Sequence, residues 1–444
     1  MPYIPHTPED AGAMLERIGA RSIDDLFADI PADMRPKSFD LPKGLSEHET
    51  LRRMADLAGR NNSGLIGFLG GGAYDHAVPA AVDALCARGE FYTAYTPYQP
   101  EASQGTLQAI FEYQTAVCRL MDMEVANASV YDGGSALFEA AMMCARAARA
   151  RRLVVDECVN PFYRAMLATL SANVDVEIVV VPHKSGKSDL EALSAALDGE
   201  TAAVLVQNPG FFGSVHDFSV LFAEAHEKKA KAVLLVNPLM QAVLKTPGAM
   251  GADAAVADGQ PLGMYLSFGG PYLGMMACSR DMARQMPGRI VGRTADLEGR
   301  TGYVLTLQAR EQHIRRAKAT SNICSNQALC ALRCIVHLSL LGPAGLARTA
   351  ETAMLRAREA VCALTAIEGV SLLSDAPYGY EFALRLPKDA REVAEKLLGK
   401  GIAAGLPLGR YGKGLDRVLL SACTEKTRPE DIARFAAALA EVLN

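Results

Sequence analysis

The fold is decided by residues 153–206, which read LVVD (153–156), PFYRAMLATLS (161–171), VEIVVV (176–181), LEALSAAL (190–197) and AAVLV (202–206). Each short apolar run predicts a strand, and each helically periodic run between them predicts a helix. The alternation continues with a helix at 218–229 and strands at 233–236, 254–257 and 275–278. Apolar strands separated by helices predict a mostly parallel sheet covered on both faces, an α/β fold. Ligands of such sheets bind beyond the carboxyl ends of the strands.

The 444 residues are too many for one ordinary core, and we expect three parts. Residues 1–63 are predicted to be a helical arm that is interrupted by prolines and wraps another surface. Residues 64–342 are expected to form the large α/β domain, including a long connecting helical region at 310–340. Residues 343–444 predict a smaller C-terminal α+β domain, after a boundary marked by Gly342, Pro343 and Gly345.

Composition excludes several classes of function. The net charge of −5 gives no basic footprint for nucleic acid. We read no apolar run of the ~20 residues that span a bilayer, so we expect no membrane contact. The N-terminus has early acidic residues and no apolar core, which favours the cytoplasm. The ten cysteines and the histidines show no metal-ligand spacing, so we expect buried thiols and no metal.

A stiff aromatic loop precedes one of the predicted helices. Residues 91–115 read FYTAYTPYQPEASQGTLQAIFEYQT, with Tyr92, Tyr95 and Tyr98 beside two X-Pro bonds. Proline fixes its own φ and pushes the preceding residue toward extended conformations. We expect Ser103 or a neighbour to cap the helix that follows. The loop either presents a site or is a surface connection with its hydroxyls in water.

Two glycine-rich turns are further candidates. Residues 68–76 read FLGGGAYDH, and triple glycine allows a ligand, another chain or a packed neighbour to approach the backbone closely. Residues 131–135 read YDGGS and open a predicted helix at 136–150. A glycine-serine helix start can bind an anion, and a plain capped helix has the same pattern.

The order of these parts resembles the fold type I pyridoxal-phosphate enzymes, the aspartate-aminotransferase-like architecture. Four motifs carry a closer resemblance to the glycine decarboxylase P-protein, the P-protein of the glycine cleavage system. They are GGGAYDHAVP (70–79), YTPYQPEASQGTLQAIFEYQT (95–115), ANASVYDGGSALFEA (126–140) and REQHIRRAKATSNICSNQAL (310–329). The match is to the N-terminal half of that family, which in many bacteria is a separate subunit, and it runs from Met1 to the C-terminus.

The resemblance implies a reaction and its partners. In this family glycine is decarboxylated on pyridoxal phosphate, CO2 leaves, and the aminomethyl group passes to the lipoyl arm of H-protein. Pyridoxal phosphate acts as the electron sink. It needs a lysine that holds it covalently and a carboxylate beside its ring nitrogen. The family also implies an assembly of two copies each of subunits 1 and 2.

This chain lacks both groups in the places where the family has them. The lysine should follow the strand at 251–258, where the chain reads Gly259, Gln260 and Pro261. No lysine occurs between Lys245 and Lys318. The carboxylate should end the strand at 233–236, where Asn237 stands. We therefore expect subunit 2 to bind the cofactor and this chain to hold none covalently.

The implied role of this chain is to complete the partner's active site. We expect no catalytic residue on this chain alone. The residues expected to support the partner's site are Tyr92, Tyr95, Tyr98, Gln99, Glu101, Ser103, Gln104, Gly71, Gly72, His76 and Asn322. Arg315 and Arg316 are further candidates for a contact with the partner or with H-protein, and a solvated face is the alternative.

Two other functions stay open at this point. The chain could be a purely structural or regulatory subunit with no residue in the site. It could also be a stand-alone pyridoxal-phosphate enzyme, which would be yellow and carry a lysine adduct reducible by borohydride. Replacing Tyr95 and Tyr98 with phenylalanine separates the first alternative from a site-building role.

Overall fold

The computed structural model describes residues 5–38 and 40–444, and it divides into two compact units, 1–63 and 64–444. The first unit contains α1 (Pro8–Ile18) and α2 (Glu47–Ala58), each opened by a capping box, and short 3-10 turns at Ile23–Phe27 and Ala32–Met34. None of its helices has a buried residue. These helices are therefore held by their caps and local pairs, and their apolar side chains are exposed.

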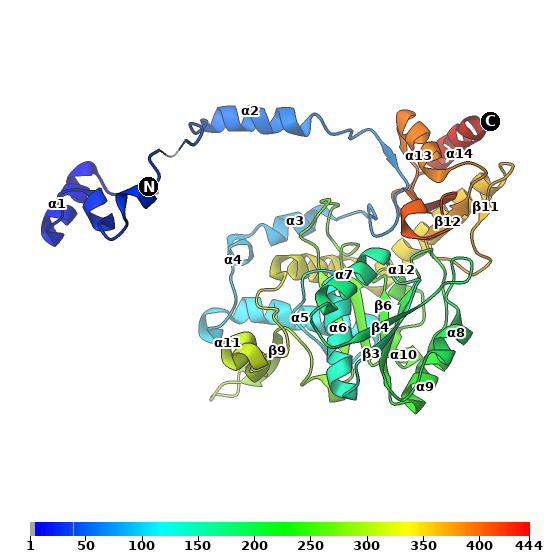
Figure 1. Cartoon of the computed structure of the whole chain (residues 1–444), viewed down its shortest axis with the longest axis horizontal. Helices are drawn as coiled ribbons and strands as arrows, with labels where there is room; N and C mark the ends of the chain where they lie inside the picture. The colour runs from blue at the N-terminus through cyan, green and yellow to red at the C-terminus, as the bar shows by residue number, and fades with distance from the viewer. Residues whose placement is uncertain (1–4, 39) are drawn as a thin grey trace. The chain divides into compact units, whose positions relative to one another are not determined.

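A seven-stranded sheet forms the centre of the second unit (Figure 1). The strands are β2 (Val125–Ala126), β3 (Arg152–Asp156), β4 (Glu177–Val181), β5 (Thr201–Asn208), β6 (Lys231–Val236), β7 (Ala254–Asp258) and β8 (Gly274–Cys278). Their order is β2-β8-β7-β6-β5-β3-β4. The pairs from β7 to β4 are parallel, and β8 is antiparallel to both of its neighbours. The predicted mostly parallel sheet is confirmed.

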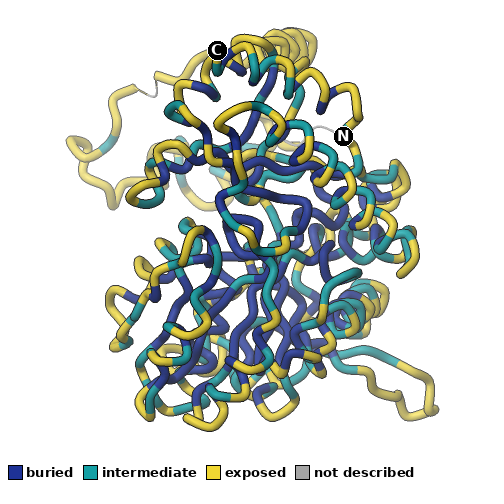
Figure 2. The backbone as a smooth tube through the Cα atoms, turned by 90° about the vertical axis from the view of Figure 1, so that its right-hand side faces the viewer, coloured by how far each residue is buried: buried dark blue, intermediate teal, exposed yellow. Residues whose placement is uncertain are grey.

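Helices cover both faces of this sheet, which is why its strands are apolar throughout. Leu205 of β5 packs into the cluster that contains residues of α6 (Gly133–Ala148) and α7 (Pro161–Ser171). Val204 and Val206 point the other way, into the cluster with α5 (Gln104–Met121), α9 (Ser219–Glu227) and α12 (Ala328–Thr365). The short α8 (Leu190–Ala195) lies on this second face too. Figure 2 shows the buried strands at the centre and exposed chain around them.

The expected long helical region at 310–340 is wrong in its first part. Residues 308–318 form short turns, namely Gln308–Arg310, α11 (Gln312–Arg315) and Arg316–Lys318. Residues 319–327 are irregular, and the helix begins at Ala328. Polar side chains before it bond other backbone segments in place of a helical ladder: Asn326 Nδ2 donates to the Ala128 carbonyl (3.2 Å) and to Ser129 Oγ (3.0 Å).

Helix α12 joins the large domain to the small one. It consists of two helical segments that meet at Gly342, where φ is 61° and ψ is 179°, so the predicted boundary falls at the kink between them. By length and composition alone α12 could cross a membrane, contrary to our reading of the sequence. In this chain its small and apolar residues, such as Cys334, Ala350 and Ala357, belong to the main core.

The small domain is built on a four-stranded antiparallel sheet of β11 (Ser371–Leu372), β12 (Glu381–Arg385), β15 (Val418–Ala422) and β14 (Leu406–Pro407). Helices α13 (Ala390–Gly399) and α14 (Pro429–Leu443) pack with it. The chain after residue 64 attaches here, because β1 (Ile66–Gly67) pairs with β13 (Ile402–Ala403). Leu69 forms an antiparallel bridge with Ser421. The glycine-rich turn therefore lies between the two domains.

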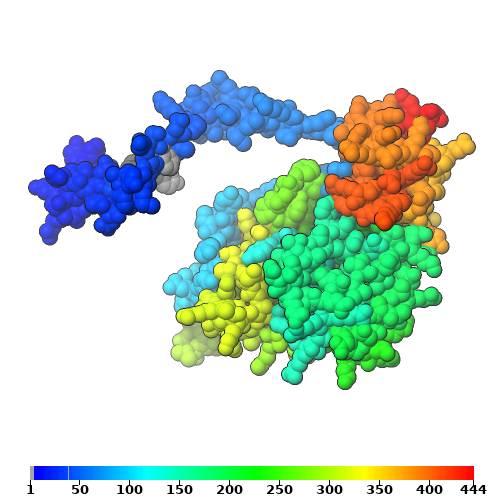
Figure 3. All heavy atoms as spheres, in the orientation of Figure 1, coloured from blue at the N-terminus to red at the C-terminus, as the bar shows by residue number. Residues whose placement is uncertain are grey.

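A hairpin and several short helices complete the second unit. They are α3 (Ala80–Cys86), α4 (Gly89–Tyr92), the turn Pro100–Ala102, the turn Met240–Ala242, α10 (Pro247–Met250), the turn Arg280–Met282, β9 (Ile290–Ala295), β10 (Thr301–Thr306) and the turn Gly409–Tyr411. In Figure 3 the light blue segment before α5 and the yellow to yellow-green segment that follows β8 lie side by side at one edge of the large domain.

Candidate functional site

A large cleft opens at the carboxyl ends of β5, β6 and β7, as expected for a sheet of this kind. It has a volume of about 1020 Å³. Gln207, Asn237 and Asp258 line it where those strands end, and Tyr131 and Asp132 line it where α6 begins. Gly71, Gly72, Tyr380 and Glu381 border it from the glycine-rich turn and the small domain.

Two carboxyl groups of the chain hold the first turn of α6. Asp132 is the N-cap, and its Oδ1 accepts from the Ser135 N–H at 2.7 Å. Asp258 Oδ2 accepts from the Gly133 N–H at 3.1 Å, and its Oδ1 accepts from the Gln260 N–H at 3.0 Å. The YDGGS sequence is thus a capped helix start, and a second internal carboxyl lies against it.

The buried carboxyl of Glu381 fixes the glycine-rich turn. Its Oε1 accepts from the Gly71 N–H at 2.5 Å, and its Oε2 accepts from the Tyr74 hydroxyl at 2.9 Å. Gly71 has a φ of 69°, a backbone conformation that glycine adopts without strain. The close approach that the triple glycine permits is therefore to Glu381 of the same chain.

These buried carboxyls predict a pH dependence of stability. Burial raises the pKa of Glu381 from 4.5 to about 7 and the pKa of Asp258 from 3.8 to about 6, against backbone hydrogen bonds that lower both. At a pH between the unfolded and the folded pKa of each group, the carboxyl is ionised in the unfolded chain and protonated in the folded chain. We expect the free energy of unfolding to fall by a few kcal/mol as the pH rises from about 4 to 7.

Urea unfolding between pH 4.5 and 8 checks this prediction. In Glu381→Gln the side chain has no proton to lose, so the slope of unfolding free energy against pH should become shallower than in the unchanged chain. An identical slope in both proteins would contradict it.

Asn237 stands at the end of β6, where a carboxylate was expected from the family pattern. Its Nδ2 donates to the Tyr380 hydroxyl, and its Oδ1 accepts from the backbone N–H groups of Leu239 (3.1 Å) and Met240 (3.3 Å). The side chain is therefore engaged in holding the loop after β6, and it carries no charge for a ring nitrogen.

Gln260 and Pro261 line the cleft where a cofactor lysine was expected. Gln260 is buried, and its Nε2 donates to the carbonyls of Tyr74 (3.1 Å) and Met264 (3.0 Å). Among the described residues that line the cleft none is a lysine, and Arg410 is the one basic residue beside the carboxyls of Asp132, Asp258 and Glu381 in that lining. The residues present do not fit a covalently bound pyridoxal phosphate.

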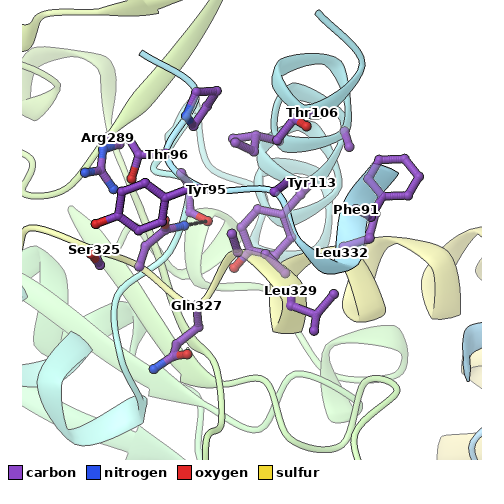
Figure 4. A pocket seen from close by; sticks show the side chains of 18 of the residues that line it. Phe91, Tyr95, Thr96, Thr106, Tyr113, Arg289, Ser325, Gln327, Leu329 and Leu332 are labelled. Carbon is purple, nitrogen blue, oxygen red and sulfur yellow. Dashed lines mark hydrogen bonds between the residues drawn. The ribbon is translucent and has the colours of Figure 1, made fainter. Parts of the chain in front are cut away.

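A second, smaller pocket lies under the tyrosine loop (Figure 4). Its volume is about 240 Å³. Tyr92 and Tyr95 line it from the loop and Thr106 and Tyr113 from α5. The segment 325–327 and the first turns of α12 line the other side. The Tyr113 hydroxyl is buried without a hydrogen-bond partner. Gln327 borders both cavities, so the tyrosine loop is separated from the large cleft by this segment.

Two of the loop tyrosines extend into solvent. Tyr95 is 80% exposed and Tyr92 is 66% exposed. Pro97, which follows them in the loop, is buried. Exposed tyrosines, with an apolar ring and a polar hydroxyl, are enriched where a protein contacts another molecule. In this chain the loop does not border the cleft at the strand ends, so its tyrosines are available to a neighbour.

Tyr98 is held by a buried arginine that sequence reasoning missed. Arg289 Nη2 donates to the Tyr98 hydroxyl at 3.2 Å, and its Cζ lies 5.5 Å from the centre of the Tyr98 ring. Glu311 Oε2 is 3.9 Å from Arg289 Nε, and the His313 ring packs edge-on against Tyr98 at 5.9 Å. Nothing in the spacing of these residues could indicate the cluster, since they come from separate segments.

Two glutamines of α5 tie the loop and helix to the β9–β10 hairpin. The Gln104 side chain accepts from the Tyr303 N–H (2.9 Å) and donates to the Tyr303 carbonyl (2.9 Å). Gln114 makes the same pair with Val291, at 2.9 and 3.0 Å. Gln104 also donates to the Pro100 carbonyl at 2.8 Å, so it holds the end of the loop.

The two glutamines give a matched stability test. Gln114 is 7% exposed, so Gln114→Ala leaves the Val291 N–H and carbonyl buried and unpaired, and should cost about 2 kcal/mol. Gln104 is exposed, water replaces it in Gln104→Ala, and the cost should stay below about 1 kcal/mol. Urea unfolding measures both, and equal losses would contradict the assignment.

The other expected residues lie in different surroundings. Gln99, Glu101 and Asn322 are exposed, and Ser103 occupies the N-cap position of α5 without a side-chain cap bond, so the expected cap is wrong. His76 is buried away from the loop, with its Nδ1 2.8 Å from Glu425 Oε2. The structure thus gathers Tyr92, Tyr95, Tyr98 and Gln104 at one edge, and Gly71 and Gly72 in the large cleft.

Comparisons with known proteins agree with these features. The family model for the glycine cleavage system P-protein matches residues 1–439. A probable glycine dehydrogenase (decarboxylating) subunit 1 of Nitratidesulfovibrio vulgaris strain Hildenborough is 63% identical over 100% of both chains. The protein of the same name from Geotalea uraniireducens is 55% identical over 98% of both.

Solved structures extend the comparison. A crystal structure of glycine decarboxylase (P-protein) of the glycine cleavage system, in inhibitor-bound form, matches with a TM-score of 0.94 and 44% identity over 100% of both chains. A sphingosine-1-phosphate lyase of Burkholderia pseudomallei matches with a TM-score of 0.69 at 16% identity over 93% of this chain and 94% of the other, which shows the fold alone. The fold is that of the fold type I pyridoxal-phosphate enzymes.

Proposed function

Because this chain belongs to the glycine cleavage system P-protein family, we propose that it is subunit 1 of glycine dehydrogenase (decarboxylating). With subunit 2 it would decarboxylate glycine and transfer the aminomethyl group to the lipoyl arm of H-protein. The observation that carries this proposal is a complete fold whose large cleft is lined by no lysine among the described residues. A chain with that cleft needs a partner to hold the cofactor.

Pyridoxal phosphate, bound by subunit 2, supplies an electron sink for the charge left when CO2 departs. This chain contributes a preformed surface that borders the partner's active site. The hydroxyls of Tyr95 and Tyr98 can donate hydrogen bonds to a carboxylate or a phosphate in the partner's site; Arg289 holds Tyr98, and Gln104 ties the end of the loop to the hairpin. Hydrogen-bond donors that are in position before the reaction need no further reorganisation free energy during it.

We further propose the assembly and its surroundings. Two copies of each subunit form the enzyme, in the cytoplasm. The exposed Arg315 and Arg316 are placed to attract an acidic H-protein, since exposed cations steer association. The charge contrast would make this docking sensitive to salt.

Reconstitution tests the proposal. The chain is co-purified with the candidate subunit 2, and absorbance and exchange of labelled CO2 with glycine are measured on the pair and on each chain alone. We expect a colourless isolated chain, a yellow pair, and exchange only in the pair. Exchange by this chain alone, or by subunit 2 alone at the full rate, would refute it.

A further inference from the structure

The N-terminus of α6 is turned toward the large cleft, and it is already occupied by the chain's own acid. A helix N-terminus with glycines is where a phosphate binds most readily, through free N–H groups and the positive end of the helix dipole. Here the Gly133 N–H is 3.1 Å from Asp258 Oδ2, and the Ser135 N–H is 2.7 Å from Asp132 Oδ1.

Side chains also pack closely around the two glycines of this turn. A methyl group placed on Gly133 would lie 2.8 Å from the Tyr163 hydroxyl and 2.9 Å from Asp258 Cβ. One placed on Gly134 would lie 2.5 Å from Met166 Sδ and 3.0 Å from Tyr163 Cδ1. The Cα atoms of Gly133 and Gly134 are thus closely packed by Tyr163 and Met166, and the Asp258 carboxyl is the group that accepts from the Gly133 N–H.

The charged groups that line the cleft also disfavour the binding of a phosphate. Its described lining contains the carboxyls of Asp132, Asp258 and Glu381 and a single guanidinium, that of Arg410. The Arg410 guanidinium is exposed and lies over the Tyr411 ring at 4.7 Å. A dianionic phosphate at the first turn of α6 would meet the carboxyls of Asp132 and Asp258, which already accept hydrogen bonds from that turn.

We infer that Asp258 is an internal substitute for a cofactor phosphate, which closes this chain's own cofactor cleft to pyridoxal phosphate. This goes beyond the missing lysine. A lysine-free cleft could still bind the cofactor without a covalent bond, whereas a cleft with a carboxylate at the phosphate position excludes it. The inference rests on the proposed function only in naming the cofactor concerned.

Pyridoxamine phosphate is the suitable probe, because it has no aldehyde and cannot react with surface lysines. Pyridoxamine is its matched control without the phosphate. Binding of each to the full-length chain alone is measured by ligand fluorescence and equilibrium dialysis. The unchanged chain should show no preference for the phosphorylated compound.

Asp258→Ala removes the carboxylate and opens space before Gly133. We expect it to bind pyridoxamine phosphate at least about tenfold more tightly than pyridoxamine, and inorganic phosphate should compete. Asp258→Asn loses the charge but keeps the shape, so its gain should be smaller. Glu381→Gln is the matched control, because it changes a carboxyl of the same cleft that bonds Gly71 and Tyr74 and not α6, and its gain should be much smaller than that of Asp258→Ala.

Two results would overturn the inference. One is a phosphate preference of tenfold or more in the unchanged chain. The other is the absence of any gained preference in the position-258 variants that retain the melting behaviour of the unchanged chain. Because the assay uses one chain and no turnover, a reconstituted pair without activity would refute the proposed function and leave this inference standing.

Discussion

Replacing both Tyr95 and Tyr98 with phenylalanine should lower glycine–CO2 exchange by the assembled enzyme about 100-fold, the usual loss when preorganised hydrogen-bond donors are removed from a reaction site. Tyr95 is 80% exposed in the isolated chain, so loss of its hydroxyl has no effect on the core. Phenylalanine keeps the ring and its packing. The exchange rate is measured on pairs of equal subunit composition.

A control separates a site residue from an interface residue. Tyr303 lies on the neighbouring β10 strand and packs against Phe111, and Tyr303→Phe removes a hydroxyl at the same edge of the domain without touching the loop. It should leave the exchange rate within about twofold of the unchanged pair, as surface substitutions do. Full exchange by an assembled Tyr95→Phe/Tyr98→Phe pair would leave this chain a purely structural subunit.

Replacing Arg289 with leucine should both destabilise the chain and disable the loop. The Arg289 side chain is 4% exposed, and it lies beside Glu311, whose side chain is 10% exposed and also has His313 Nδ1 at 3.7 Å. Removing one member of a buried pair leaves the other charge uncompensated, and we expect a loss of about 3 kcal/mol in unfolding free energy. Tyr98 would lose its hydrogen bond and its cation–π contact.

The activity of the Arg289 variants identifies the positioning role. In Arg289→Lys the charge remains but the planar group that stacks on Tyr98 is lost, so stability should recover more than exchange activity does. Arg293→Leu removes an exposed arginine of the same hairpin and should change neither quantity. Parallel recovery of stability and activity in Arg289→Lys would mean that Arg289 acts only through folding.

The sequence could predict most of the large domain because its signals are local. The runs at 153–156, 176–181 and 202–206 became β3, β4 and β5 within two residues at either end. Helix α7 begins and ends at the residues expected, because Pro161 occupies its first turn and marks the start. Prediction failed at 310–327, where polar side chains bond distant backbone segments.

In the candidate site, too, the local features could be predicted and the long-range contacts could not. The aromatic loop was visible in the sequence because proline and tyrosine spacing is a local property. The residues that hold it were not visible, since Arg289 is 191 positions from Tyr98 and Gln104 is 199 from Tyr303. His76 is beside the glycine turn in the sequence, and only the fold shows that it is buried against Glu425.

By itself, the sequence determined the α/β fold, the family, and the absence of a lysine where the family holds its cofactor. These follow from periodicity, motifs and residue identity, which are properties of neighbours along the chain. Only the tertiary structure decided that Asp258 lies at the first turn of α6, that Glu381 holds the glycine turn, and that Arg289 stacks on Tyr98. Those contacts join segments that are far apart in the chain. Burial determines the ionisation of the groups in them and the strength of their interactions.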